Sequence, residues 1–436
     1  MSILSFQNRI NQRLQQHFHY AWIVVGIAFL IMLLTAATRA TPSILILPLE
    51  HAFGWSRTTI SLALSINLAL FGLMGPFAAA AMQRYGIRPT VLIALTVLAS
   101  LVALSTLMTR SWHMWLIWGV GVGSATGVTY MTLGATIVNR WFKEKKGLAM
   151  GLLTASSATG QLIFLPVLAY VVENYGWQTL ILIVSGAIGL IIPLVLFFLP
   201  ECPESVKLNQ YGENAPSVAV NNEPLKNPIF IAFDALKHAI KFKDFWLLFF
   251  SFFICGASTN GFIGTHFIAM CHDYGMTAVK GAGILALMGL FDIVGTTFSG
   301  WLSDRYNNRV LLFWYYGLRG LALIFLPYAF GFSYFGLPIF ALFYGLDWIA
   351  TVPPTVKLTS DVFGSQRAPI IFGWIVTGHQ LGAAFTAFLA GVMRNSLGTY
   401  TLATMIAGFL CLIAAVLVLR INKGGIQLLS SAKQTL

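Results

Sequence analysis

The sequence carries little charge for its length. Only 9% of its 436 residues are Asp, Glu, Lys or Arg, whereas 57% are hydrophobic and the mean hydropathy is +0.78. A soluble globular domain has about 25% charged residues, so these charges could not solvate the surface of a soluble protein. This scarcity predicts an integral membrane protein and excludes soluble enzymes. We expect the net charge of +12 to reflect basic loops on one side of a membrane, with no nucleic-acid partner.

Motifs of catalysis and of metal binding are also missing. The sequence has no Walker A, G-x-S-x-G or H-E-x-x-H pattern. Its four cysteines lack the spacing of a metal site or a disulfide framework: Cys202, Cys255, Cys271 and Cys411. We therefore expect no enzyme activity, no ATP-driven transport by this chain alone, no metal and no cofactor.

Long apolar runs, by contrast, are abundant. About 20 apolar residues suffice for a helix to cross a bilayer, and open strands cannot satisfy their backbone in lipid. Hydropathy and helix breakers predict twelve spans: 20–49, 57–81, 89–109, 112–139, 147–172, 177–200, 244–271, 279–302, 310–330, 333–357, 367–393 and 400–420. The first run is too long for the apolar part of a signal peptide, so we expect it to be retained. The predicted fold class is an all-α membrane protein with twelve transmembrane helices in two six-helix halves.

The joins between these helices are short, with one exception. Residues 201–243 contain four prolines and five lysines, which predicts a cytoplasmic linker. Within it, 229–243 is amphipathic and is expected to lie on the membrane surface. The predicted organisation is a tail, a six-helix half, the linker, a second six-helix half and a C-terminal tail, at 1–19, 20–200, 201–243, 244–421 and 422–436.

Lys and Arg are distributed unevenly over the loops. Twenty of the 26 lie in the tails and the even-numbered loops, four lie in the odd-numbered loops, and Arg39 and Arg319 lie within spans. Cytoplasmic loops carry the excess of basic residues in membrane proteins. We therefore expect both termini to be cytoplasmic, in a bacterial inner membrane.

The two halves match each other at a constant offset of 221 residues. The segment 51–56 corresponds to 272–277, and the basic pattern at 84–88 corresponds to that at 305–309. Internal duplication of this kind is typical of transporters built from two related halves around a site near the bilayer midplane.

The loop after the second span of each half carries a family pattern. Gly300-Trp-Leu-Ser-Asp304-Arg305-Tyr-Asn-Asn-Arg309 resembles G-x-x-x-D-R-x-G-R, the loop signature of the major facilitator superfamily. The resemblance covers nearly the whole chain and implies that family's twelve-helix fold. It also implies a cytoplasmic conformational latch, in which the acid clasps a neighbouring helix terminus and stabilises the outward-facing state. The expected latch residues are Arg84, Arg88, Asp304, Arg305 and Arg309; Gln83 replaces the acid of the first copy, which leaves Asp304 as the better candidate.

Within this superfamily the chain looks most like the monocarboxylate-transporter-like group. The resemblance rests on residues 141–160, where an aromatic pair and a basic run precede closely spaced small residues, and on Trp22 and Phe291-Asp292. In that group the acid is followed four residues later by an Arg that binds substrate carboxylate, whereas this chain has Thr296 there. The basic run is expected at the cytoplasmic face, against anionic lipid, and the small residues at a helix contact: Lys143, Lys145 and Lys146, then Gly147, Gly151, Ser156 and Gly160.

Four charged residues are predicted within spans, where each costs at least about 2.5 kcal/mol and needs a partner or a water-filled cavity. They are Arg39, Asp292, Arg319 and Asp347, and their charges sum to zero. The repeat offset places Asn260 opposite Arg39, so we expect both to contact substrate, since Arg is a forked donor suited to a carboxylate. The alternative for Arg39 is a structural pairing or a position at the interface. Asp292 is expected either to form a buried ion pair with Arg319 or to accept a proton.

Further polar residues lie at the predicted depth of a substrate site. Asp347 shortly precedes Pro353-Pro354, which must break or kink the tenth span, and a broken helix beside a buried acid is typical of transporter sites. His379 and Gln380 lie near the midplane and are expected substrate contacts; the alternative for His379 is one hydrogen bond to a neighbouring carbonyl. His266 lies near the other end of its span and is interpreted as a hydrogen-bonded interface histidine.

These features together predict a secondary active transporter that moves a small organic anion, a carboxylate, by alternating access and in symport with protons. The alternatives are a carrier of a larger polycarboxylate, such as a carboxylate-type siderophore, and an exporter of amphipathic compounds. A membrane-embedded sensor or enzyme is a more distant alternative. The expected partners are the anion, protons and membrane lipid, and the protein is expected to be monomeric.

Overall fold

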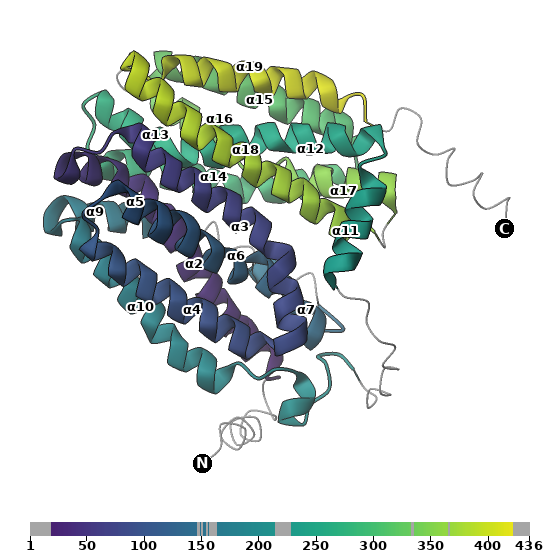
Figure 1. Ribbon diagram of the computed structural model, residues 1–436. Helices are drawn as coiled ribbons and strands as arrows, with labels where there is room; N and C mark the ends of the chain where they lie inside the picture. The colour runs from purple at the N-terminus through teal and green to yellow at the C-terminus, as the bar shows by residue number, and fades with distance from the viewer. Residues whose placement is uncertain are drawn as a thin grey trace. The chain divides into compact units, whose positions relative to one another are not determined.

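A computed structural model describes residues 19–145, 149, 151–153, 156, 164–213, 228–332, 335–364 and 367–421 (Figure 1). In these ranges the regular elements are all helical, and one isolated bridge joins Phe142 to Tyr211. The all-α class is therefore confirmed. The tails up to residue 18 and from 422, the middle of the linker (214–227), and Lys146, Gly147 and Gly160 lie outside the described residues.

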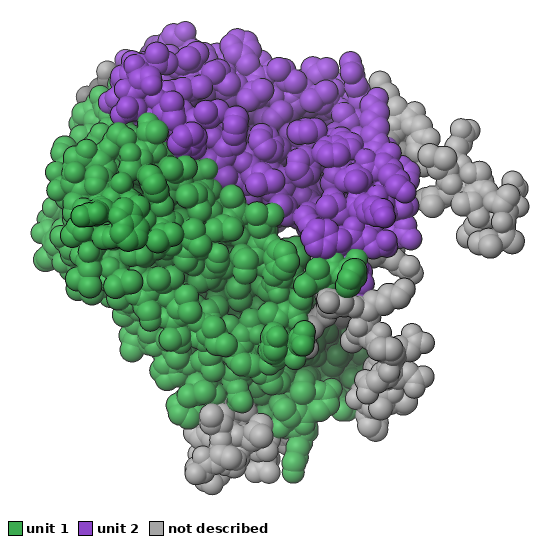
Figure 2. Space-filling model, in the orientation of Figure 1, with its two compact units in different colours: residues 1–230, 271–286 green, residues 231–270, 287–436 purple. Residues whose placement is uncertain are grey.

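The chain divides into two compact units, coloured separately in Figure 2. The first consists of residues 1–230 and 271–286, and the second of residues 231–270 and 287–436. The helices before the linker are α2 (Ala21–Phe53), α3 (Arg57–Tyr85), α4 (Ile87–Leu104), α5 (Ser111–Met114), α6 (Gly123–Val128), α7 (Met131–Trp141), α9 (Leu165–Tyr175) and α10 (Trp177–Phe198). A π-helical segment, η2 (Trp115–Val122), joins α5 to α6, and short 3₁₀ turns η1 (Ser105–Leu107) and η4 (Pro203–Val206) follow α4 and α10.

Nine further helices follow in the described part of the chain. They are α11 (Pro228–Ala239), α12 (Lys243–Gly256), α13 (Gly264–Asp273), α14 (Ala278–Ser303), α15 (Asn308–Ala329), α16 (Gly336–Leu346), α17 (Val352–Phe363), α18 (Ala368–Leu397) and α19 (Thr401–Val418). A second π-helical segment, η5 (Ala257–Ile263), joins α12 to α13. Its extra-wide turns lie at the residues that sequence analysis assigned to the middle of the seventh span.

Ten stretches of the described residues are helical, long and apolar enough to cross a membrane. They are Ala21–Phe53, Arg57–Met82, Ile87–Leu107, Ser111–Trp141, Trp177–Phe198, Lys243–Asp273, Ala278–Ser303, Asn308–Ala329, Ile370–Leu397 and Thr401–Val418. The fifth expected span is described mainly by α9. The tenth consists of two shorter helices, α16 and α17, separated at residues 347–351. The arrangement fits the twelve-helix architecture expected from the sequence.

A buried arginine explains why residues 271–286 belong to the first unit. Arg57, 6% exposed at the start of α3, donates through Nη1 and Nη2 to both carboxylate oxygens of Asp273 at 2.9 Å and through Nε to Glu50 at 3.0 Å. A second contact is made by Glu173 of α9, whose Oε1 accepts from the backbone N of Val279 in the first turn of α14 at 3.0 Å. A carboxylate is favourable there because a helix N-terminus has unpaired N–H groups and a positive dipole end.

Candidate functional site

The tenth span is broken where the sequence places two prolines. α16 ends at Leu346, residues 347–351 form turns, and α17 resumes at Val352 with Pro353 and Pro354 in its first turn. Proline lacks the N–H that would continue the helical ladder, so it is favoured in the first turn of a helix. The break exposes backbone groups that lipid cannot satisfy, and each needs a partner within the protein.

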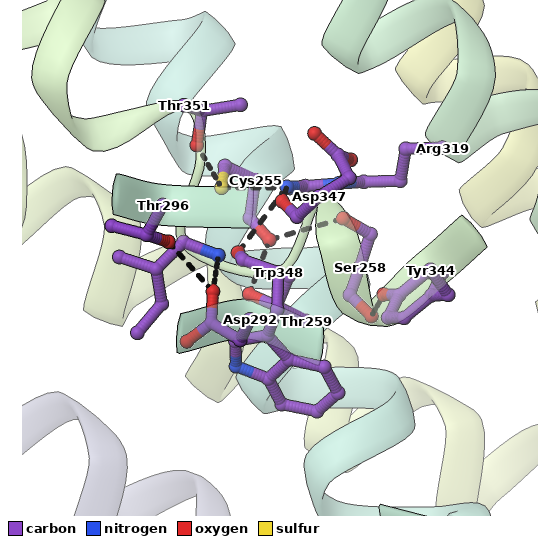
Figure 3. Close-up of polar contacts among 11 residues, drawn as sticks. Cys255, Ser258, Thr259, Asp292, Thr296, Arg319, Tyr344, Asp347, Trp348 and Thr351 are labelled. Atoms are coloured by element: carbon purple, nitrogen blue, oxygen red, sulfur yellow. Dashed lines mark hydrogen bonds and ion pairs between the residues drawn. The ribbon is translucent and has the colours of Figure 1, made fainter. Parts of the chain in front are cut away.

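Arg319 of α15 binds the carbonyl side of this break (Figure 3). Its side chain is fully buried, and Nη2 donates to the carbonyl oxygens of Asp347 at 2.5 Å and Trp348 at 3.3 Å. Nε donates to Oδ2 of Asp347 at 2.6 Å, and Nη1 lies 2.8 Å from Sγ of Cys255. The guanidinium therefore neutralises one carboxylate and also satisfies two carbonyl groups that have lost their helical partners.

Asp292 of α14 binds the amide side of the same break. It is 4% exposed, and its Oδ1 accepts hydrogen bonds from the backbone N of Ile349 at 2.9 Å and from Oγ1 of Thr296 at 2.7 Å. The expected ion pair between Asp292 and Arg319 is wrong as to partner, because the ion pair of Arg319 is with Asp347. Asp292 and Asp347 both lie at this break. The guanidinium of Arg319 pairs with the carboxylate of Asp347, whose backbone carbonyl it also binds. Thr296, which stands where the resembling group has an arginine, donates to Asp292.

Three further side chains complete the polar cluster. Ser299 of α14 donates to the carbonyl of Ala350 at 2.5 Å, and Sγ of Cys255 lies 3.3 Å from Oγ1 of Thr351. Tyr344 of α16 donates to the carbonyl of Ser258 in η5 at 2.7 Å. Sequence reasoning missed these contacts because a lone Cys, Ser or Tyr in an apolar span carries no pattern. The Pro353-Pro354 pair was the available signal, since a break requires polar neighbours.

Two close backbone approaches hold the helices in this arrangement. A Cβ at Gly295 of α14 would overlap the carbonyl of Leu346, the last residue of α16. A Cβ at Gly256, where α12 meets η5, would overlap the carbonyl of His379 in α18. Gly295 lies one turn after Asp292, so its missing side chain is what lets the Asp292 carboxylate reach Ile349. Small residues at such contacts are the usual means of close helix packing in membranes.

The charges at the break do not balance. Arg319 contributes one positive charge, whereas Asp347 and Asp292 contribute two carboxylates, all within one cluster of the second unit. Within the described residues, Oδ1 of Asp347 has no hydrogen-bond partner. One buried negative charge is therefore without a counter-charge unless a proton or another cation neutralises it.

The first unit contains the opposite imbalance at Arg39 of α2. Its guanidinium carbon lies 3.8 Å from the ring centroid of Phe71 and 5.3 Å from that of Tyr130, and the Tyr130 side chain is a hydrogen-bond neighbour. Its Nε is enclosed without a hydrogen-bond partner, and no ion pair of Arg39 occurs in the described part of the chain. Aromatic rings attract a cation but do not neutralise it.

The other predicted contacts lie in the second unit. Asn260 lies in η5, where its carbonyl accepts from Oγ1 of Thr265 at 2.8 Å. The ring of His379 lies 4.8 Å from that of Phe252, and Gln380 is 6% exposed with Oε1 unpaired among the described residues. That these residues meet Arg39 across one substrate path stays a prediction.

His266 is held as the sequence interpretation expected. Its Nε2 lies 2.8 Å from the carbonyl of Ala387, and its Nδ1 lies 3.1 Å from the hydroxyl of Tyr400. A carbonyl only accepts, so the neutral ring must carry its proton on Nε2 and accept the tyrosine O–H at Nδ1. Both ring nitrogens are thus used in packing α13 against α18 and α19.

In the latch loop of the first half, an acid that follows α10 caps the N-terminus of α4. The carboxylate of Glu201, just after α10, accepts from the backbone N of Ile87 at 2.6 Å and of Arg88 at 3.0 Å. Arg140 donates to the Glu201 carbonyl at 3.2 Å, and the guanidinium of Arg84 lies over the ring of Tyr85. Glu201 therefore supplies the helix-capping carboxylate that position 83 lacks.

In the second-half latch loop, Asp304 forms an ion pair with Lys357 of α17 at 3.2 Å. The Asp304 side chain is 80% exposed, so the pair contributes little to stability. The guanidinium of Arg305 lies 4.1 Å from the ring centroid of Trp301, and Arg309 donates to the carbonyl of Ile421 at 3.2 Å. Whether these residues act as a conformational latch stays a prediction.

Comparison with known proteins identifies a family and several relatives of this chain. A model of the Major Facilitator Superfamily matches residues 27–368. An uncharacterized MFS-type transporter, YcxA of Bacillus subtilis (strain 168), is 25% identical over 406 residues, which cover 87% of this chain and 90% of that protein. Monocarboxylate transporter 12-B of Danio rerio is 24% identical over 411 residues, which cover 89% of this chain and 84% of that protein.

Solved structures agree in fold. The xylose transporter XylE from E. coli, in a partially occluded inward-open conformation, matches with a TM-score of 0.68 at 14% identity, over 92% of this chain and 98% of that one. A variant of the nucleoside transporter NupG matches with a TM-score of 0.73 at 11% identity, over 93% of this chain and 100% of that one. At these identities the likeness shows the twelve-helix fold alone.

The close approach at Gly295 generates a stability prediction. Gly295→Ala should lower the melting temperature of the purified protein by several degrees, because the added methyl group must push α14 away from Leu346, at a cost of about 1–3 kcal/mol or more. Gly283→Ala on the same helix is the control, since a Cβ there meets nothing within 4 Å. Equal melting temperatures for the two variants would contradict the close approach.

Proposed function

The chain belongs to the major facilitator superfamily and is a multi-pass membrane transporter; from this premise we propose that it moves a small organic anion, a carboxylate, by alternating access and in symport with protons. The proposal includes a bacterial inner-membrane location, cytoplasmic termini and a monomeric state. It includes no catalysis. The monocarboxylate transporters among its relatives, at 22–25% identity, support the substrate class.

The observation that carries this proposal is the pair of uncompensated charges. Arg39 has aromatic neighbours in place of an acid, and the Asp292–Arg319–Asp347 cluster has one carboxylate in excess. An unpaired charge within a span costs at least about 2.5 kcal/mol. Binding of a carboxylate to Arg39 and of a proton to the cluster would remove both costs, and the translocated pair would be neutral overall.

Asp292 is the better proton acceptor of the two acids. Asp347 is the counter-ion of Arg319 and receives a charge-assisted hydrogen bond from it, whereas both donors to Asp292 are neutral groups. Protonation of Asp292 on its other oxygen leaves Oδ1 as a carbonyl acceptor for the Ile349 amide. A proton could therefore bind and leave without releasing the broken helix.

The number of unpaired basic groups favours a monocarboxylate over a polycarboxylate. Of the two arginines within spans, Arg319 is bound by Asp347 and by backbone carbonyls, so Arg39 remains for the substrate. Thr296 offers a hydroxyl in place of a second guanidinium, and that hydroxyl already donates to Asp292. A carrier of a larger polycarboxylate would need further cationic groups, and an amphipathic-compound exporter would not need Arg39.

The topology is tested with a reporter enzyme fused after Leu436. The twenty-to-four asymmetry of basic loop residues predicts that the fusion is active only when the reporter works in the cytoplasm. A second fusion in the loop between Gly54 and Arg57 should give the opposite result. Periplasmic activity of the first fusion would contradict twelve spans with cytoplasmic termini.

The substrate role of Arg39 is tested by substitution. The probe is whichever of acetate, lactate, pyruvate and benzoate raises the melting temperature of the parent most, with citrate as the polycarboxylate comparison. Arg39→Lys keeps the positive charge but loses the paired N–H donors of the guanidinium, and Arg39→Gln loses both the charge and the paired donors. Since a hydrogen bond to a charged group contributes about 1.5–3 kcal/mol, we expect the affinity for the probe to fall about 10- to 100-fold in Arg39→Gln, and less in Arg39→Lys.

Affinity is measured by the thermal shift and by uptake of the labelled probe into proteoliposomes. Arg110→Gln, at the start of the fourth span, removes the same charge from an exposed position and should behave like the parent. Normal uptake by Arg39→Gln would show that Arg39 does not bind the substrate. A larger thermal shift from citrate than from every monocarboxylate would favour the polycarboxylate alternative.

The coupling role of Asp292 is tested by separating its charge from its hydrogen bonds. Asn at this position still accepts from Ile349 and Thr296 but cannot bind the proton. We therefore expect Asp292→Asn to be present in the membrane at parental abundance and to exchange labelled probe by counterflow, yet to fail to concentrate it under an inward proton gradient.

Asp292→Leu and Thr296→Val are the matched controls. The first leaves the Ile349 amide without an acceptor, at a cost of about 1–3 kcal/mol, so its folded abundance should fall. The second keeps the carboxylate, and we expect it to keep proton-driven accumulation. If Asp292→Asn concentrates the probe as the parent does, Asp292 caps the broken helix and does not couple protons.

A further inference from the structure

The helix α11, in the linker between the halves, has apolar side chains that the other described residues leave exposed. Phe230 is 73% exposed, Phe233 is 49% exposed and Ile240, one residue after the helix, is 41% exposed. The opposite side of the helix is buried, with Ala235 at 7% and Ala239 at 0% exposure. Small residues thus face the protein, and large apolar residues face away from it.

This orientation is fixed by two tryptophans of the second unit. Nε1 of Trp374 in α18 donates to the carbonyl of Ala232 at 2.9 Å, and its ring lies 5.6 Å from that of Phe233. Nε1 of Trp246 in α12 donates to the carbonyl of Ile240 at 2.9 Å. α11 therefore lies across the ends of α12 and α18, as Figure 1 shows, and does not extend either helix.

The exposed apolar face of α11 continues onto the lipid-facing side of the seventh span. Trp246 is 41% exposed and Phe250 is 49% exposed, and both lie on α12, which begins a membrane span. We expect these exposed apolar side chains to face lipid. Since the carbonyl of Ile240 accepts from Trp246 at the start of this span, we also expect α11 to lie at the depth of the lipid headgroups.

Basic side chains gather on the same helix and beside it. Lys237 and Lys241 are exposed, and Arg367, at the start of α18, acts electrostatically on His238 together with Lys241. Burial first, and then these two positive charges, lower the pKa of His238, while Asp234 opposes the effect. Asp234 balances only part of the charge of Lys237, Lys241 and Arg367, so the cluster keeps a net positive charge that attracts anions.

We propose that this surface, formed by Phe230, Phe233, Lys237, Lys241 and Arg367, binds anionic phospholipid headgroups, with its aromatic residues inserted among the acyl chains. The apolar continuity with α12 requires a lipid, and the basic cluster selects an anionic one. A basic residue near an anionic membrane surface strengthens binding about fivefold. The lipid would bind α11 and, through Trp374, the helix that carries His379 and Gln380.

The test uses the full-length protein, purified in a neutral detergent. Dioleoyl phosphatidylglycerol or dioleoyl phosphatidylcholine is added in increasing proportion, and the melting temperature is recorded, because a ligand that binds the native state raises it. We expect phosphatidylglycerol to reach its half-maximal effect at a lower proportion than phosphatidylcholine. In Lys237→Gln/Lys241→Gln/Arg367→Gln that difference should disappear, and in Lys237→Gln alone the half-maximal proportion should rise about fivefold.

Two matched variants and one anion complete the design. Arg110→Gln/Lys207→Gln/Lys280→Gln removes the same number of positive charges elsewhere and should keep the parental difference between the lipids. Phe230→Ser should weaken the effect of both lipids. Persistence of the phosphatidylglycerol effect in the first triple variant, or its loss in the control triple variant, would overturn the proposal. An equal effect of inorganic phosphate would overturn it in favour of a site for soluble anions.

Discussion

A helix broken inside a membrane must find hydrogen-bond partners within the protein, and this requirement organises the second half of the molecule. The tenth span is interrupted at residues 347–351, because Pro353 and Pro354 cannot donate to the carbonyls four residues earlier. Arg319 binds the carbonyls on one side, and Asp292 binds an amide on the other. Two helices, α15 and α14, are thereby held to one five-residue segment, and the absent side chain of Gly295 allows α14 to approach Leu346 at the end of α16.

The same requirement explains the charge distribution. Satisfying carbonyls deep in the protein takes a multiple donor, and Arg319 supplies one at the cost of burying a positive charge. Asp347 neutralises that charge. Asp292 accepts a hydrogen bond from the amide of Ile349 and adds a second carboxylate. The excess negative charge is thus a by-product of capping the break from both sides. Under the proposed function, a proton would bind to this excess charge in the second half and a carboxylate would bind to Arg39 in the first.

Sequence patterns predict the depth of a residue in the membrane better than the direction in which it points. Hydropathy located the spans because bilayer thickness sets their length, and the proline pair located the break. Asp292 and Asp347 lie at similar depth, so span arithmetic could not decide which of them pairs with Arg319. The choice depends on the rotation of α14 and α15 about their axes. Glu201 and Arg57 were missed for a related reason: loop charges look alike in sequence, and only the fold shows that Glu201 caps α4 and Arg57 binds Asp273.

An acid that stabilises the fold can couple protons only if its structural hydrogen bonds and ion pairs remain when its carboxyl group is protonated. Asp347 fails this condition, because a neutral carboxyl would leave the buried guanidinium of Arg319 without its counter-ion. Asp292 meets it, because both of its hydrogen bonds reach one oxygen and that oxygen remains an acceptor when the other is protonated. We therefore propose different roles for the two acids of this cluster: Asp347 is the fixed counter-ion of Arg319, and Asp292 exchanges the proton.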